Sequence, residues 1–171
     1  VDDLPYYDGR PVRFSTGQWA VLMVAVALGF AALTAQIPLF ADRFGQFVPA
    51  ILFMALPLAA LAWVTPSHWT AIFRKVGIRD VGWMFFFAAI NFAVTAAVGF
   101  AVMQWHGAHA NPAGALMAGL SAGDLALFFL KTLPQLLGEE LVTILPMLAL
   151  MAFLHERLKL SRLKTIVIAW L

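Results

Sequence analysis

Three long stretches of the chain contain no charged residue, and each is followed by polar positions. They cover residues 18–38, 47–64 and 83–104. An α-helix rises about 1.5 Å per residue, so about 20 residues cross the ~30 Å hydrocarbon core of a bilayer. The pattern therefore predicts three transmembrane helices.

Tryptophans mark the ends of these stretches, at Trp19, Trp63, Trp83 and Trp105. Indole rings prefer the headgroup layer of a membrane, and this placement is typical of an aromatic belt. The four positions support the predicted span boundaries.

The segments between the spans differ in character. Residues 1–17 are polar and contain two prolines and two glycines, so we interpret them as an exposed tail. Residues 66–76 predict a short helix on the membrane surface, because their apolar positions follow helical spacing. These positions are Trp69, Ile72, Phe73 and Val76. Residues 106–123 are rich in glycine and alanine and predict a loop.

Residues 124–158 are again largely apolar, but they are too many for one crossing. A continuous helix of this length would measure about 52 Å, which exceeds the membrane core even with modest tilt. We expect a break near Pro134 or Gly138, with the preceding piece interfacial or re-entrant. A further span begins after Ser161.

Together these elements predict an all-α polytopic transmembrane helix bundle. It has at least four spans, the start of a fifth and one short interfacial amphipathic helix. The domain organisation is a polar tail over residues 1–17 and a transmembrane domain over residues 18–171. Because the chain begins with Val1 and ends within an apolar run, we expect it to be part of a longer protein.

Composition narrows the class of protein. Hydrophobic residues make up 63% of the chain and charged residues 12%, against about 45–50% and about 25% in soluble domains. This excludes a disordered chain, a nucleic-acid-binding protein and an ordinary soluble domain. The absence of cysteine excludes disulfides, thiol catalysis and cysteine-bound metals.

The basic residues predict the orientation in the membrane. They gather in the tail, in the loop after the second span and in residues 155–164, whereas residues 105–123 contain no lysine or arginine. Basic loops stay on the cytoplasmic side. We therefore expect the N-terminus to lie in the cytoplasm. The localisation that we expect is that of an integral protein in the bacterial cytoplasmic membrane.

Glu139 and Glu140 are the main candidates for chemistry, because they interrupt an apolar run of transmembrane grade. An acid at mid-membrane costs roughly 2.5–3.5 kcal/mol on insertion scales, and intramembrane acids usually have a function. A carboxylate in this position can act as a general base. The alternative is a helix start in the headgroup layer, where acids are also favoured.

Helix geometry separates the two acids by about 100°. Glu139 shares a polar face with Gln135 and Thr143, and Thr132 lies on the same face. Glu140 points with apolar neighbours, so Glu139 is the better candidate for contact with water or substrate. Asn91, in the third span, is expected either to bond another helix or to orient Glu139.

The histidines do not complete a site around these acids. His155 lies 16 residues from Glu139, about 24 Å along a helix. His106 and His109 have i, i+3 spacing but no nearby acid, and His68 belongs to the predicted surface helix. We therefore predict no metal site within this chain.

The segment Gly-Glu-Glu-Leu-Val-Thr-Ile-Leu-Pro at residues 138–146 resembles the first motif of the CPBP (CAAX protease and bacteriocin-processing) intramembrane proteases. The family pattern is Glu-Glu-x-x-x-Arg, followed by Phe-x-x-x-His and His-x-x-x-Asn/Asp on later helices. The resemblance covers roughly residues 80–171 and implies the N-terminal half of a protease core. It implies that Glu139 and Glu140 are catalytic, that Glu139 acts with a histidine to activate water, and that the complete site leaves room for a zinc ion.

Two departures from the family pattern keep other functions open. Ile144 stands where the family has arginine, and neither histidine motif lies within the chain. The first hypothesis is an endopeptidase whose partners are membrane lipid and a peptide or protein substrate. The second is a non-catalytic scaffold, regulator or bacteriocin-immunity-like protein, and the third is a transporter or channel. A homo-oligomer or the missing C-terminal half is the expected protein partner.

Overall fold

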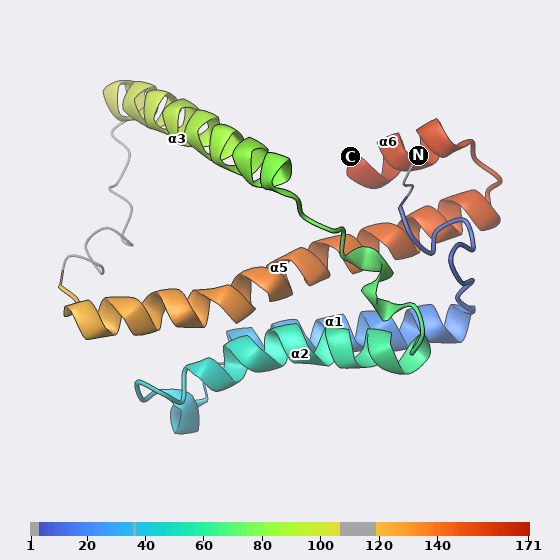
Figure 1. The fold of residues 1–171 in the computed structure, drawn as a ribbon, viewed down its shortest axis with the longest axis horizontal. Helices are drawn as coiled ribbons and strands as arrows, with labels where there is room; N and C mark the ends of the chain where they lie inside the picture. The colour runs from blue at the N-terminus through green and yellow to red at the C-terminus, as the bar shows by residue number, and fades with distance from the viewer. Residues whose placement is uncertain (1–3, 36, 107–118) are drawn as a thin grey trace. The chain divides into compact units, whose positions relative to one another are not determined.

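The computed structural model describes residues 4–35, 37–106 and 119–171, and the regular elements of these ranges are helices (Figure 1). They are α1 (Thr16–Thr34), η1 (Pro38–Phe40), α2 (Phe47–Val64), η2 (Trp69–Ile72), α3 (Ile78–His106), α5 (Ala122–Glu156) and α6 (Arg162–Trp170). The all-helical class predicted from the sequence is confirmed. The chain divides into two units, residues 1–73 with 126–171 and residues 74–125.

In the first unit α1 and α2 are antiparallel, and α5 runs beside them in the direction of α2 (Figure 1). Aliphatic side chains form one core where the three helices face one another, because each helix buries an apolar stripe against its neighbours. Its fully buried members include Leu22 of α1, Leu61 of α2, and Leu141, Leu145 and Leu148 of α5.

The start of α1 is fixed by a reciprocal capping box. The Ser15 hydroxyl accepts a hydrogen bond from the Gln18 backbone N–H, and the Gln18 side chain accepts one from the Ser15 N–H. Such a cap satisfies two backbone donors that the first helical turn leaves free. Gln18 Nε2 also donates to the Val64 carbonyl at 3.1 Å. The cap therefore joins the beginning of α1 to the end of α2.

The predicted break near Pro134 or Gly138 is wrong, because α5 is one helix from Ala122 to Glu156. A proline removes one backbone donor, and membrane helices tolerate this where neighbouring groups compensate. Gly138 serves close packing and does not end the helix: a Cβ there would lie 2.8 Å from Cγ and Cε1 of Phe53. At about 52 Å, α5 is longer than the ~30 Å hydrocarbon core of a bilayer.

The N-terminal segment is not the exposed tail that its polarity predicts. Tyr6, Tyr7 and Phe14 are buried, with exposed fractions of 1%, 2% and 4%. The Tyr6 ring stacks on Phe14 at 4.5 Å, and Tyr7 meets His155 edge to face at 5.6 Å. Three aromatic rings bury enough apolar area to hold a segment that is otherwise polar.

The surface helix predicted for residues 66–76 is also wrong in extent. Its only helical part is the four-residue 3₁₀ turn η2, after which Phe73 is extended. Trp69 and Ile72 are three residues apart, which matches the three-residue turn of a 3₁₀ helix, and both pack against the core. Phe73 and Val76 are exposed.

The second unit consists mainly of α3. The Asp80 carboxylate accepts a hydrogen bond from the Gly77 N–H at 2.8 Å, which stabilises the helix start. α3 begins at Ile78, five residues before the predicted span. The loop predicted at 106–123 falls mostly on residues 107–118, which lie outside the described residues.

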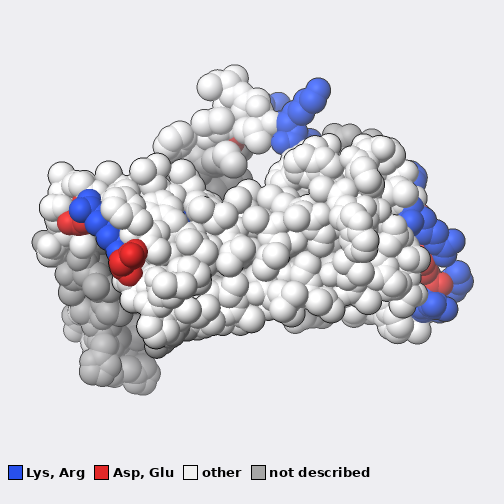
Figure 2. Space-filling view, turned by 90° about the horizontal axis from the view of Figure 1, so that it is seen from below, with Lys and Arg blue, Asp and Glu red and all other residues white. Residues whose placement is uncertain are grey.

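Among the described residues, four helices are long and apolar enough to cross a membrane: α1, α2, α5 and the stretch Ile78–Trp105 of α3. On the face that Figure 2 draws, charged side chains gather toward the two ends of the molecule and a broad uncharged surface lies between them. These features indicate an integral membrane protein. A helix does begin after Ser161, as predicted, but α6 has nine residues and its crossing of the membrane stays a prediction.

Candidate functional site

One face of α5 carries polar side chains at intervals of four residues. They are Lys131, Gln135, Glu139 and Thr143. Gln135 Nε2 donates to Glu139 Oε1 at 3.1 Å, and Thr143 Oγ1 donates to the Glu139 carbonyl at 2.9 Å. The structure thus brings together three of the predicted site residues. Thr132 bonds instead to the Phe128 carbonyl, at 2.8 Å.

The position of Glu139 is set by the helix packing beside it. The preceding residue, Gly138, is buried against Phe53 of α2, whereas Glu139 itself is exposed. Because neighbouring helix positions point about 100° apart, the contact at Gly138 turns the Glu139 carboxylate away from the α2–α5 interface. Gln135 then restrains one carboxylate oxygen and leaves Oε2 for another partner.

Glu140 is exposed as well and follows a different face of α5, beside the exposed side chains of Leu133 and Leu136. Within the described ranges, no hydrogen bond or ion pair reaches its carboxylate. An acid in a membrane span is costly when it faces lipid. This face of α5 is therefore suited to contact with water or with a further polar element.

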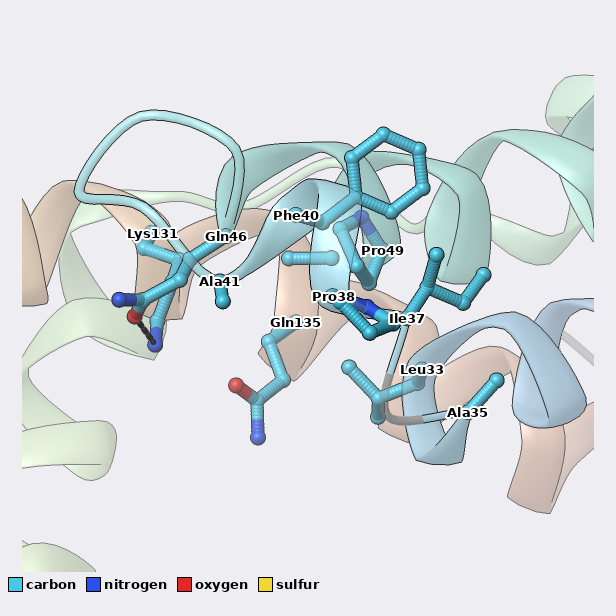
Figure 3. A pocket seen from close by; sticks show the side chains of 11 residues that line it. Leu33, Ala35, Ile37, Pro38, Phe40, Ala41, Gln46, Pro49, Lys131 and Gln135 are labelled. Atoms are coloured by element: carbon cyan, nitrogen blue, oxygen red, sulfur yellow. Dashed lines mark hydrogen bonds between the residues drawn. The ribbon is translucent and has the colours of Figure 1, made fainter.

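A pocket of about 380 Å³ opens next to the polar face, among the end of α1, η1, the start of α2 and α5 (Figure 3). Lys131 Nζ donates to Gln46 Oε1 at 3.1 Å, and Gln135 lines the same pocket. Gln135 thus lines the pocket and also bonds Glu139. Sequence reasoning missed the role of Gln46, since no periodicity relates it to a residue 85 positions away.

Asn91 lies in α3, in the other unit of the chain. Its Oδ1 accepts a hydrogen bond from Thr95 Oγ1 at 3.4 Å, one turn further along the same helix. Its predicted role in orienting Glu139 stays a prediction.

Two histidines contact the N-terminal segment. His155 is half-buried beside Tyr7, and its Nδ1 lies 3.2 Å from the Leu160 carbonyl oxygen. The carbonyl of His68 accepts the hydroxyl of Tyr6. His106 is the last residue of α3, and His109 lies outside the described residues.

The described residues do not form a zinc site. Across these ranges, no group of three or more His, Asp or Glu side chains is placed to hold a metal ion. Glu139 and Glu140 diverge by about 100° around the helix, so the two carboxylates do not converge on one ion.

No protein-family model matches this chain, and no curated protein or solved structure is significantly similar to it.

Proposed function

We propose that this chain is the glutamate-bearing part of an intramembrane endopeptidase of the CPBP type. The observation that carries the proposal is the setting of Glu139. Its carboxylate projects from the middle of an apolar helix, inside the Glu-Glu segment that resembles the family's first motif, and is held by Gln135. An acid is costly at such a position, and acids found there usually have a function. This favours a catalytic role for Glu139.

In the proposed reaction Glu139 acts as a general base. Its free Oε2 accepts a proton from a water molecule, while the water oxygen attacks the carbonyl carbon of a peptide bond. The C–N bond then breaks, and the proton passes from Glu139 to the leaving nitrogen. Gln135 keeps the carboxylate in one orientation through these steps. The resemblance assigns the remaining groups to histidines on later helices, in the same polypeptide or in a partner.

We assign the chain to a bacterial cytoplasmic membrane, and its charge distribution supports an N-terminus in the cytoplasm. Arg13 forms an ion pair with Glu156 at 2.9 Å, so the N-terminal segment and the end of α5 lie at the same end of the first unit. Arg157, Lys159 and Arg162 follow directly in the sequence. A basic cluster of this kind favours the cytoplasmic side.

A second candidate is a non-catalytic protein with the same fold, acting as a scaffold, regulator or immunity factor. Ile144 favours it, because this side chain is half-buried and packs against the core where the family has an arginine. Glu140 therefore lacks the cationic partner that the resemblance assigns to it.

The test compares the full-length protein with the E139Q variant in native membranes, with E156Q as the control. Glu156 lies on the same helix but pairs with Arg13, away from the proposed site. Mass spectrometry of newly formed peptide termini measures cleavage. We expect termini that require the wild-type protein, are lost in E139Q and persist in E156Q. Termini that are unchanged in E139Q would reject the protease, and a cellular phenotype that survives E139Q would favour the scaffold.

A further inference from the structure

The pocket beside the polar face of α5 has two chemically different sides. Lys131 and Gln46 lie together on one side, Leu33 and Ala35 on the other, and the Gln135 amide lies between them (Figure 3). The remaining walls are mostly apolar: Ile37, Pro38, Phe40, Ala41, Pro49 and Ala50. A volume of about 380 Å³ is within the usual range for small-molecule sites.

The charge of the lining selects for an anion. Lys131 is the one charged side chain among the lining residues, and no carboxylate lines the pocket. Its ammonium has three N–H donors, and the bond to Gln46 Oε1 uses one of them. The Gln46 amide nitrogen adds two more donors. Two neighbouring side chains of the lining thus carry N–H donors.

The pocket lies at one end of the two candidate membrane spans α1 and α2. The chain leaves one span at Thr34 and enters the next at Phe47, so the intervening loop lies at the end of both helices. This loop nevertheless exposes Leu39 and Phe44, at 78% and 68%. Large apolar side chains beside a cation are typical of a segment that rests in the headgroup layer.

We propose that this pocket binds the phosphate group of an anionic phospholipid, with one acyl chain along Leu33 and Ile37. Lys131 supplies the charge, the Gln46 amide supplies further donors, and the apolar wall continues into the hydrocarbon core beside α1. The proposal does not depend on the proposed protease activity. A lipid carboxylate offers similar chemistry, and the experiment distinguishes the two sources.

Native mass spectrometry of the purified full-length protein tests the proposal with three probes: phosphatidylglycerol, phosphatidylcholine and oleate. We expect one phosphatidylglycerol molecule to remain bound more tightly than phosphatidylcholine. K131Q removes the cation and is expected to weaken this binding about tenfold or more, as for other hydrogen bonds to charged groups. A41W fills the pocket without changing its charge and is expected to weaken binding as well.

K164Q is the matched control, because Lys164 is an exposed lysine on α6, outside the pocket lining. It is expected to bind phosphatidylglycerol like the wild type. Equal loss in K131Q and K164Q would overturn the proposal, because it would show general attraction to basic surface. If oleate bound tightly and phosphatidylglycerol did not bind, the proposal would be overturned in favour of a carboxylate site. Equal affinity for phosphatidylglycerol and phosphatidylcholine would also overturn it.

Discussion

The ring of Phe53 on α2 lies directly against Gly138 on α5. A Cβ atom at position 138 would lie 2.8 Å from both Cγ and Cε1 of that ring. Phe53 also borders Gly29 of α1, where a Cβ would lie 3.0 Å from the Phe53 carbonyl oxygen. One aromatic residue thus packs between two glycines on two other helices. Since Glu139 follows Gly138, this contact also sets where the proposed catalytic carboxylate lies.

Replacing Gly138 with alanine is expected to destabilise the first unit by about 1–3 kcal/mol, the usual cost of overpacking. Phe53 is 1% exposed, so its ring has no free space to move into. Alanine's better helix propensity offsets at most about 1 kcal/mol of this cost. Unfolding of the purified protein in mixed micelles, followed by circular dichroism, measures the change.

G99A is the matched control for that substitution, because a Cβ at Gly99 would meet nothing within 4 Å. It is expected to be neutral or to stabilise α3 slightly. Adding F53L to G138A should restore part of the stability by shortening the opposing side chain. Equal stability of G138A and G99A would show that the Phe53–Gly138 contact is not tight.

The sequence predicts most of the long apolar helices that the structure contains. The predicted second span, residues 47–64, is confirmed residue for residue as α2, because nothing polar interrupts it and Trp63 marks its end. α1 ends at Thr34, four residues before the predicted Pro38. Pro38 begins the separate turn η1, a position that suits its fixed φ.

Prediction from the sequence fails where a residue type commonly has either of two structural roles. A glycine such as Gly138 can end a helix or can let two helices approach closely. Which of these roles it has depends here on Phe53, which is distant in sequence. The polar majority of the N-terminal segment predicts an exposed tail, whereas the burial of Tyr6, Tyr7 and Phe14 decides its position. A local pattern does not reveal a partner in another helix.

The candidate site was predictable only along its own helix. Spacing of four residues correctly placed Gln135 and Thr143 on the face of Glu139, and both form hydrogen bonds with that residue. The Lys131–Gln46 hydrogen bond joins two helices far apart in sequence and could not be found in this way.

The N-terminal segment is expected to be held by its aromatic rings and not by its ion pair. Phe14 stacks on Tyr6 and meets Trp19 at 4.9 Å, so F14A should cost about 3–5 kcal/mol, as for other buried phenylalanines. The Arg13 side chain is 70% exposed, so R13Q should cost less than about 1 kcal/mol. Limited proteolysis of the N-terminal segment measures how far F14A and R13Q each release it. Release of the segment by R13Q to the same extent would contradict this ranking.

The capping box at the start of α1 predicts a position-specific loss of stability. S15A removes the side-chain acceptor for the Gln18 N–H and is expected to cost about 1 kcal/mol. Ser161 occupies the equivalent position before α6 but makes no capping hydrogen bond with its side chain. S161A should therefore change the unfolding midpoint little. Comparing S15A with S161A in one micelle unfolding assay separates the effect of the cap from the general effect of losing a hydroxyl. Equal unfolding midpoints for the two variants would mean that the cap contributes nothing to stability.

The packing of Tyr6 predicts that the N-terminal segment is sensitive to alkaline pH. Burial raises the pKa of Tyr6 from its usual 10.0 to about 12, and the hydroxyl is also the donor to the His68 carbonyl. Below pH 10 the hydroxyl is protonated in both the docked and the released segment, so docking keeps its full strength. Between pH 10 and 12 only the released segment ionises, so docking weakens as the pH rises through this range.

Absorbance at 295 nm measures this ionisation directly, because the chain has only two tyrosines. In the Y7F variant the signal reports Tyr6 alone, and we expect a midpoint near 12. Adding F14A should move that midpoint back toward 10, since it removes the ring that stacks on Tyr6. A midpoint of 10 in Y7F itself would mean that Tyr6 is solvated and that the segment is not docked. Partial release of the N-terminal segment near pH 11 should accompany the titration. A change in Trp19 fluorescence detects this release, because Trp19 packs against Phe14.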